Sequence, residues 1–166
     1  METRVRNIVI AHLNAIKDGI AARMTQYGRN ASGHTVQSLL VRATDMGGTL
    51  EGDNAILYLE HGRGPGKIPM GFYDTIRSWV IAKGISYQQM APKKGTPEQG
   101  LARLSGAIAH SIMTKGTKLY RDKGYNDIYS ELMEKELELL SKETAGIFEV
   151  EVDKLQDIEL DEEQNE

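Results

Sequence analysis

The chain has 166 residues, 40% of them hydrophobic and 27% charged, which predicts one soluble globular domain of ordinary composition. It has no cysteine, so disulfides, thiol catalysis and cysteine-ligated metals are excluded. It also has no apolar run of the roughly 18–20 residues that a membrane span needs and no signal-peptide core, so we expect synthesis and release in the cytoplasm.

The formal net charge of −4 is distributed unevenly along the chain. Residues 153–166 contain seven acidic residues and one lysine, a net charge of −6, which leaves +2 for residues 1–152. We predict that residues 1–152 form a single folded domain. Acidic segments of this kind are usually solvated and disordered, so we expect residues 153–166 to be a flexible tail. The alternative is that this tail docks on a basic surface of a partner.

The first predicted element is a long helix over residues 3–27. Its apolar residues recur every three or four positions and fall on one face: Val5, Val9, Leu13, Ile16, Ile20 and Met24. Gly19 interrupts good helix formers at a cost of about 1 kcal/mol, which is consistent with close packing at that point. Gly28 is the expected C-cap, and a polar, turn-rich connection over residues 28–34 follows it.

Residues 35–60 are predicted to form a small antiparallel β-meander. An apolar run at residues 36–41 opens it, with a helical turn at its start as an alternative. Turn-like sequences at residues 45–48 and 52–54 separate the expected strands. In the last expected strand, residues 55–60, apolar side chains alternate onto both faces, so both faces are expected to be covered.

Helices dominate the rest of the chain. Residues 71–83 are predicted to be helical, with Trp79 in the core or, alternatively, as an interface anchor. A second helix is expected to begin after Thr96 as the N-cap, with a proline at its first position, and to end at residues 115–116. A third is expected over residues 127–144, and the alternation at residues 148–152 predicts a late strand. The fold class is α+β: a long N-terminal helix, a small antiparallel β-meander, two to three further helices, a late strand and an acidic tail.

The segment from Tyr58 to Pro69 is the most distinctive part of the sequence. It combines three alternate glycines, two prolines and basic residues. Proline lacks an amide donor and glycine tolerates positive φ, so this segment is neither regular helix nor central strand. We predict a tight, basic, extended loop between a strand and a helix. Scaffolds commonly place recognition residues on loops of this kind.

The sequence contains no recognisable catalytic constellation. Gly66-Lys67 is followed by Ile68 where a phosphate-binding P-loop has serine or threonine, so only a backbone anion-binding nest is left as an alternative. The histidines lack metal-ligand spacing, and they are His12, His34, His61 and His110. No serine lies in a nucleophile-elbow context. We therefore expect no enzymatic activity, no metal and no cofactor.

Nucleic-acid binding has a weaker basis in the sequence than a structural role. Basic residues occur in several predicted loops, namely Arg63, Lys67, Lys93, Lys94, Lys115, Lys118 and Arg121, with Tyr87, Tyr120 and Tyr125 nearby. The net charge of +2 over residues 1–152 is small for a DNA-binding protein, in which a basic stripe is expected. Proximity to DNA remains compatible with this charge, because a protein that lines a DNA channel does not need to bind DNA tightly.

Several short motifs follow one another in a particular order. They are Tyr58-x-Glu60-x-Gly62-x-Gly64-Pro65, then Pro69, then Ile76-x-x-Trp79-x-x-x-Lys83-Gly84-Ile85, then a helix ending in Lys115-Gly116-Thr117. This order resembles the phage head–tail joining and tail-completion proteins typified by the HK97 gene product 10 family. The resemblance covers residues 1–145. It departs from the family at residues 119–122, where a proline-phenylalanine pair is common, and residues 146–166 have no counterpart.

The resemblance implies a non-enzymatic structural protein of a tailed-bacteriophage virion, assembled in the host cytoplasm and located at the neck. It implies a six- or twelve-fold homo-oligomeric ring that joins the portal or connector to the tail tube or terminator protein, close to packaged DNA and without membrane contact. The assembly interface it implies comprises Glu60, His61, Gly62, Arg63, Gly64, Pro65, Gly66 and Lys67. Loops 28–34 and 85–96 are expected to face neighbours as well.

Three alternatives stay open at this point. A nucleic-acid-binding module would show salt-sensitive binding. A small hydrolase or nucleotide-binding enzyme would require a metal or cofactor for which the sequence supplies no site. A minor capsid or tail-tube component would differ from a neck ring in its copy number per particle.

Overall fold

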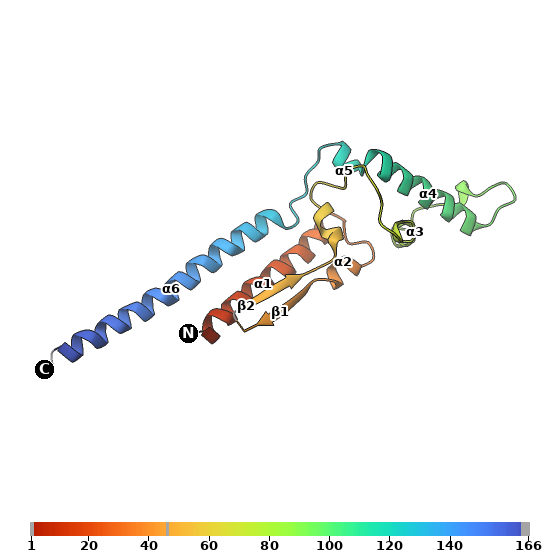
Figure 1. The fold of residues 1–166 in the computed structure, drawn as a ribbon. Coiled ribbons are helices and arrows are strands. Elements are labelled where there is room, and N and C mark those ends of the chain that lie inside the picture. Colours follow the sequence, from red (N-terminus) through yellow and green to blue (C-terminus); the bar gives the residue numbers. More distant parts are fainter. Residues whose placement is uncertain (1, 46, 164–166) are drawn as a thin grey trace. The chain divides into compact units, whose positions relative to one another are not determined.

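A computed structural model describes residues 2–45 and 47–163 of the chain (Figure 1). The elements in chain order are α1 (Glu2–Gln26), α2 (His34–Gln37), β1 (Leu40–Thr44), β2 (Gly47–Glu51), η1 (Asn54–Tyr58), α3 (Phe72–Ala82), η2 (Gln88–Met90), α4 (Pro97–Lys115), α5 (Lys118–Arg121) and α6 (Ser130–Glu163). An α+β fold with a long N-terminal helix is therefore confirmed. None of the described helices is long and apolar enough to cross a membrane.

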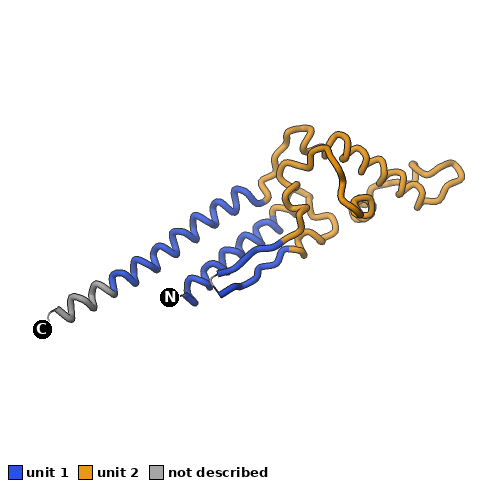
Figure 2. Tube along the Cα trace, viewed as in Figure 1, with its two compact units in different colours: residues 1–22, 39–51, 129–166 blue, residues 23–38, 52–128 orange. Residues whose placement is uncertain are grey.

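The chain divides into two compact units, which Figure 2 shows in different colours. Unit 1 comprises residues 1–22, 39–51 and 129–166, and unit 2 comprises residues 23–38 and 52–128. The expectation of a single domain over residues 1–152 stays a prediction.

Unit 1 combines α1, the β1–β2 hairpin and α6. The hairpin is antiparallel, with Val41 opposite Leu50 and Thr44 opposite Gly47. Gly19 on α1 lies against the end of the Leu132 side chain of α6, where a Cβ would overlap that side chain. The close packing expected at Gly19 is thus present, and α6 supplies the neighbour.

Unit 2 has its apolar core between α3 and α4. The buried residues of this core are Ile76, Val80, Leu101 and Ala109, and the partly buried residues packed against them are Phe72, Ile85, Tyr87, Leu104, Ile108 and Ile112. The start of α4 has the predicted N-cap, Thr96, and the predicted proline at the first helical position, Pro97. The structure adds a capping box, in which Thr96 and Gln99 each bind the other's backbone. Trp79 is 38% exposed, so its expected place in the core is wrong, whereas the interface-anchor alternative stays a prediction.

The third strand of the predicted meander is absent from the described residues. Residues 54–58 form η1 instead, because the Asp53 side chain accepts a hydrogen bond from Ala55 N at 3.1 Å and the Asp53 carbonyl accepts one from Ile56 N at 3.0 Å. These local bonds satisfy backbone groups that a strand would have offered to a partner. The sheet of the described residues is a two-stranded hairpin.

The predicted late strand at residues 148–152 is also wrong, because these residues belong to α6. Alternation over five residues does not fix a strand without a partner strand beside it. On the helix, Ile147 is buried at 4% exposure, and Glu151 pairs with Lys154 three positions later. The backbone of α6 continues to Glu163, so residues 153–163 of the expected tail are helical. The flexibility of that tail stays a prediction, and residues 164–166 lie outside the described residues.

Candidate functional site

Two segments that are distant in sequence run side by side in unit 2. Arg63 N donates to Thr117 Oγ1 at 2.9 Å, and Thr117 N donates to the Arg63 carbonyl at 2.8 Å. Gly66 N donates to the carbonyl of Met113, in the last turns of α4, at 2.8 Å. We call residues 61–67 and 115–125 the paired-loop surface. The first and last motifs of the resemblance therefore meet at one place.

Glycine is required where these two backbones cross. Gly62 has φ +77°, and a Cβ there would overlap Thr117 Oγ1 and lie 2.6 Å from Tyr120 N. Gly116 has φ +78°, and a Cβ there would lie 2.8 Å from the Arg63 carbonyl oxygen. Both positions combine a left-handed conformation with a backbone neighbour, and only glycine tolerates both. The spacing of these motif glycines thus has a local structural cause.

Glu60 anchors the loop from inside. Its side chain is only 1% exposed, and Oε1 accepts a hydrogen bond from Ile128 N at 3.2 Å. The Glu60 carbonyl accepts from Asn126 N at 2.9 Å, while Asn126 Nδ2 donates to the Leu59 carbonyl at 3.2 Å. Buried carboxylates are rarely found without such partners. Glu60 therefore fixes residues 126–128 beside the loop and is not accessible to a neighbouring protein.

The other residues of the expected interface differ in accessibility. The exposed ones are His61, Pro65, Gly66 and Lys67, and the half-buried ones are Gly62, Arg63 and Gly64. The His61 ring lies 5.1 Å from the ring of Tyr125, centroid to centroid. Arg63 Nη2 donates to the Lys67 carbonyl at 2.6 Å, and its guanidinium carbon lies 5.5 Å from the centre of the Phe72 ring. An assembly role for these residues stays a prediction.

The paired-loop surface is strongly basic. It contains six basic residues and one acid, a formal net charge of +5: Arg63, Lys67, Lys115, Lys118, Arg121 and Lys123, with Asp122. All of the basic residues except Arg63 are exposed. Tyr120 and Tyr125 add exposed aromatic rings. Such a surface attracts carboxylate or phosphate groups through charge and adds apolar contact through its tyrosines.

From the sequence, these basic residues were expected on several separate loops, and Lys123 was not among them. The structure brings the cations of residues 63–67 together with those of residues 115–123, because the backbone hydrogen bonds hold the two segments side by side. Lys93 and Lys94 lie on a different segment, after η2. No local pattern predicts a pairing between segments about fifty residues apart.

In unit 1, His12 lies between two carboxylates of α6. Its Nδ1 is 2.8 Å from Glu136 Oε2, and its Nε2 is 3.5 Å from Glu143 Oε2. The hydrogen bond with Glu136 raises the pKa of His12 above its ordinary value, burial opposes this, and Glu143 adds to the rise. No local sequence pattern indicates this cluster, because 124 residues separate His12 from Glu136.

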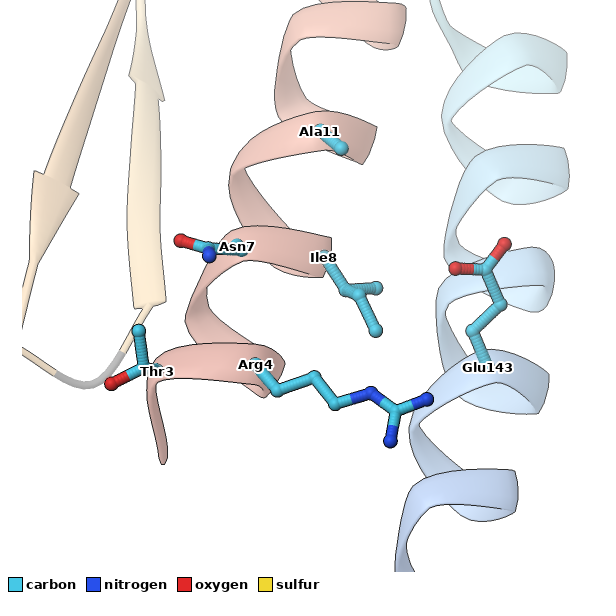
Figure 3. A pocket seen from close by; sticks show the side chains of 6 residues that line it. All are labelled: Thr3, Arg4, Asn7, Ile8, Ala11 and Glu143. Atoms are coloured by element: carbon cyan, nitrogen blue, oxygen red, sulfur yellow. The ribbon is translucent and has the colours of Figure 1, made fainter. Parts of the chain in front are cut away.

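An open groove of about 550 Å³ lies next to this cluster in unit 1 (Figure 3). Its lining residues are Thr3, Arg4, Asn7, Ile8, Ala11 and Glu143. Figure 3 shows the Arg4 side chain extending from α1 toward Glu143 on α6. Across the described residues, no group of three or more histidine, cysteine or acidic side chains is placed to hold a metal.

The chain matches no protein-family model, no curated protein and no solved structure.

Proposed function

We propose that this protein is a structural component of a tailed-bacteriophage virion that forms a ring in the neck and joins the portal or connector to the tail. One observation carries the proposal. The motif glycines Gly62 and Gly116, which come from separate motifs of the resemblance, fit against the opposite backbone. Motifs that depend on each other in this way favour a shared structural element over a chance similarity of short sequences.

Some residues of the loop hold it in place and others are exposed, and this arrangement supports an assembly role. The contacts of Glu60 and Gly62 hold the loop in place. The exposed residues of the loop are His61, Pro65, Gly66 and Lys67. A loop fixed from inside presents its outer residues in a defined arrangement, so a neighbour binds it with little loss of conformational entropy. The outer residues of the loop are thus the proposed contact with adjacent virion proteins.

Quantitative mass spectrometry of purified particles from the source phage tests the proposal. We expect this protein at a ratio of one-half or one relative to the portal protein, as a six- or twelve-fold ring requires. A much higher ratio would indicate a tail-tube or capsid component. Absence from finished particles would refute a structural role in the virion.

The second candidate function is a nucleic-acid-binding module. The observation that favours it is the net charge of +5 on the paired-loop surface, together with the exposed Tyr120 and Tyr125. Phosphate contacts release counterions, so binding to short duplex DNA is expected to weaken steeply as salt rises. Lys67→Glu/Lys118→Glu would then reduce binding more than the matched reversal Lys93→Glu/Lys94→Glu, which changes the charge equally outside this surface.

A further inference from the structure

Helix α6 of unit 1 carries a row of exposed apolar side chains. They recur at helical spacings, and each is between 39% and 52% exposed: Met133, Leu137, Phe148 and Val152. Thr144 continues the row between Leu137 and Phe148, and its hydroxyl donates to the Leu140 carbonyl at 2.8 Å within the helix. We call the four apolar residues and Thr144 the α6 stripe. At about 1.5 Å per residue, the stripe is about 28 Å long.

The helix packs on α1 through a different face (Figure 3). Leu132 lies against Gly19 of α1, and Glu136 Oε2 lies 2.8 Å from Nδ1 of His12. Ile147 is buried. Each of these three α6 residues directly precedes a member of the α6 stripe, so the stripe lies about 100° round the helix from the face toward α1. The contact with α1 therefore leaves the stripe exposed.

The border of the α6 stripe that points away from α1 is acidic. An acid directly follows each of the four exposed apolar residues, and these acids are Glu134, Glu138, Glu149 and Asp153. All four are exposed, and Lys142 pairs with Glu138 at 2.7 Å. Across residues 130–154, the sequence of α6 has eight acids and three lysines, a formal net charge of −5. The stripe thus combines an apolar row with negative charge along one side.

Apolar surface and charge together decide which kind of molecule fits the α6 stripe. A continuous exposed apolar row is typical of a surface that binds another molecule. A second α6 would bring another helix of net charge −5 against the first, and like charges at a contact oppose binding. An anionic membrane surface is disfavoured for the same reason. A helix whose apolar row is bordered by lysine or arginine matches both features of the stripe.

We propose that the α6 stripe binds an amphipathic helix of a partner protein, whose apolar face is bordered on one side by lysine or arginine. Burial of the two apolar rows supplies the affinity, and the acidic border selects the partner and its orientation. The proposal does not depend on the neck function. The stripe belongs to unit 1 and the paired-loop surface to unit 2, so variants of one leave the residues of the other unchanged.

Binding of designed peptides to the full-length protein tests the proposal. The basic peptide has about 20 residues, which matches the length of the α6 stripe, with leucines on one helical face and lysines along one border. The acidic peptide has glutamates in place of the lysines. The scrambled peptide keeps the composition of the basic peptide without its apolar row. Fluorescence anisotropy of labelled peptides gives each Kd at low and at high salt.

One pair of variants tests the apolar row. Leu137→Gln/Phe148→Gln removes two apolar side chains of the α6 stripe. Leu139→Gln/Val150→Gln is the matched control, because these residues are similarly exposed on α6 but lie outside the stripe. We expect the stripe variant to bind the basic peptide at least about tenfold more weakly than the wild type, and the control to stay within about twofold. Circular dichroism and the urea midpoint confirm that each variant is folded.

A third variant tests the acidic border. Glu134→Lys/Glu149→Lys reverses two of its four acids. We expect the wild type to prefer the basic peptide and this variant to prefer the acidic peptide, with both preferences reduced at high salt. A reversed preference requires the border to lie at the contact, whereas a general effect on folding would weaken the binding of both peptides.

Other outcomes would overturn the proposal. Equal affinity of the wild type for the basic and scrambled peptides would reduce the binding to net charge. An equal loss of binding in the control variant would place the contact outside the α6 stripe. Self-association of the wild type that Leu137→Gln/Phe148→Gln abolishes would assign the stripe to a second copy. Binding to phosphatidylcholine–phosphatidylglycerol vesicles that the same variant abolishes would assign it to a membrane. None of these results changes the particle ratio expected of a neck ring, so the two proposals fail separately.

Discussion

Glu60 is a buried side chain of unit 2 whose loss we expect to destabilise the fold, because its carboxylate accepts a hydrogen bond from Ile128 N. Glu60→Ala leaves that amide without its acceptor and is expected to lower the free energy of unfolding by about 1–3 kcal/mol. Glu60→Gln keeps an acceptor oxygen and should cost less. Urea unfolding of both variants measures the difference, and equal costs would contradict the role given to the hydrogen bond.

A second prediction at the residue scale concerns Gly62. Gly62→Ala is expected to destabilise the protein by more than the roughly 1 kcal/mol of a left-handed alanine, because its Cβ also meets Thr117 Oγ1 and Tyr120 N. Gly28→Ala is the matched control, since Gly28 has φ +62° and nothing within 4 Å of a Cβ. Thermal unfolding compares the two variants. A Gly62→Ala midpoint no lower than that of Gly28→Ala would show that the crossing tolerates a side chain.

His12 makes stability depend on pH. Its pKa in the folded protein is raised above 6.5, chiefly by Glu136. The unfolded chain therefore loses the proton first, so the contribution of His12 is fully present below pH 6.5 and is lost as the pH rises through the folded pKa. His12→Gln should remove this pH-dependent contribution to stability. We expect the unfolding free energies of the wild type and the variant to converge toward the alkaline end of a series from about pH 5 to about pH 9. A difference that stays constant with pH would contradict this role of His12.

At the scale of elements, the start of α4 offers a direct test. Thr96→Ala removes the side-chain half of the capping box and is expected to cost about 1 kcal/mol in the free energy of unfolding. Thr96→Ser keeps the capping hydroxyl and serves as the control. Chemical denaturation distinguishes them, and a neutral Thr96→Ala would mean that water or the Gln99 side chain satisfies the same backbone groups.

The elements that the sequence predicted best have both periodicity and end signals. α1, α3 and α4 combine an apolar face with a recognisable cap or terminating glycine, and their bounds agree with the predicted ranges to within about two residues. Residues 55–60 and 148–152 have alternation alone. In the first case the Asp53 cap favours η1, and in the second the helix already formed by preceding residues continues. Alternation is a weak signal where no partner strand lies beside the segment.

At the scale of the whole chain, the candidate site was predictable in composition but not in arrangement. The glycines and cations of residues 61–67 stand out in the sequence, whereas their pairing with residues 115–125 depends on backbone hydrogen bonds between distant segments. The same limit applies to Glu60, which the sequence placed at the end of an expected strand and the resemblance placed in an assembly interface, and which is buried. Sequence patterns report local preferences, and these contacts are not local.

The neck proposal leads to a prediction for assembled particles. Lys67→Trp places a bulky ring on the exposed part of the loop without touching its buried anchors, so we expect a folded subunit that no longer supports head–tail joining. Lys93→Trp is the control on another exposed loop. Electron microscopy of particles produced with each variant gives the count of joined heads and tails. Normal joining with Lys67→Trp would remove this part of the loop from the interface.

The crossing of Gly62 and Gly116 also limits how this sequence can change over generations. At each position the added carbon would approach a backbone atom of the other segment, Tyr120 N or the Arg63 carbonyl oxygen. A clash with a side chain can be relieved by a smaller side chain elsewhere, whereas every residue type carries the same backbone atoms. No second substitution therefore rescues the loss of either glycine, and a saturation mutagenesis screen should show both positions as intolerant even in backgrounds stabilised elsewhere.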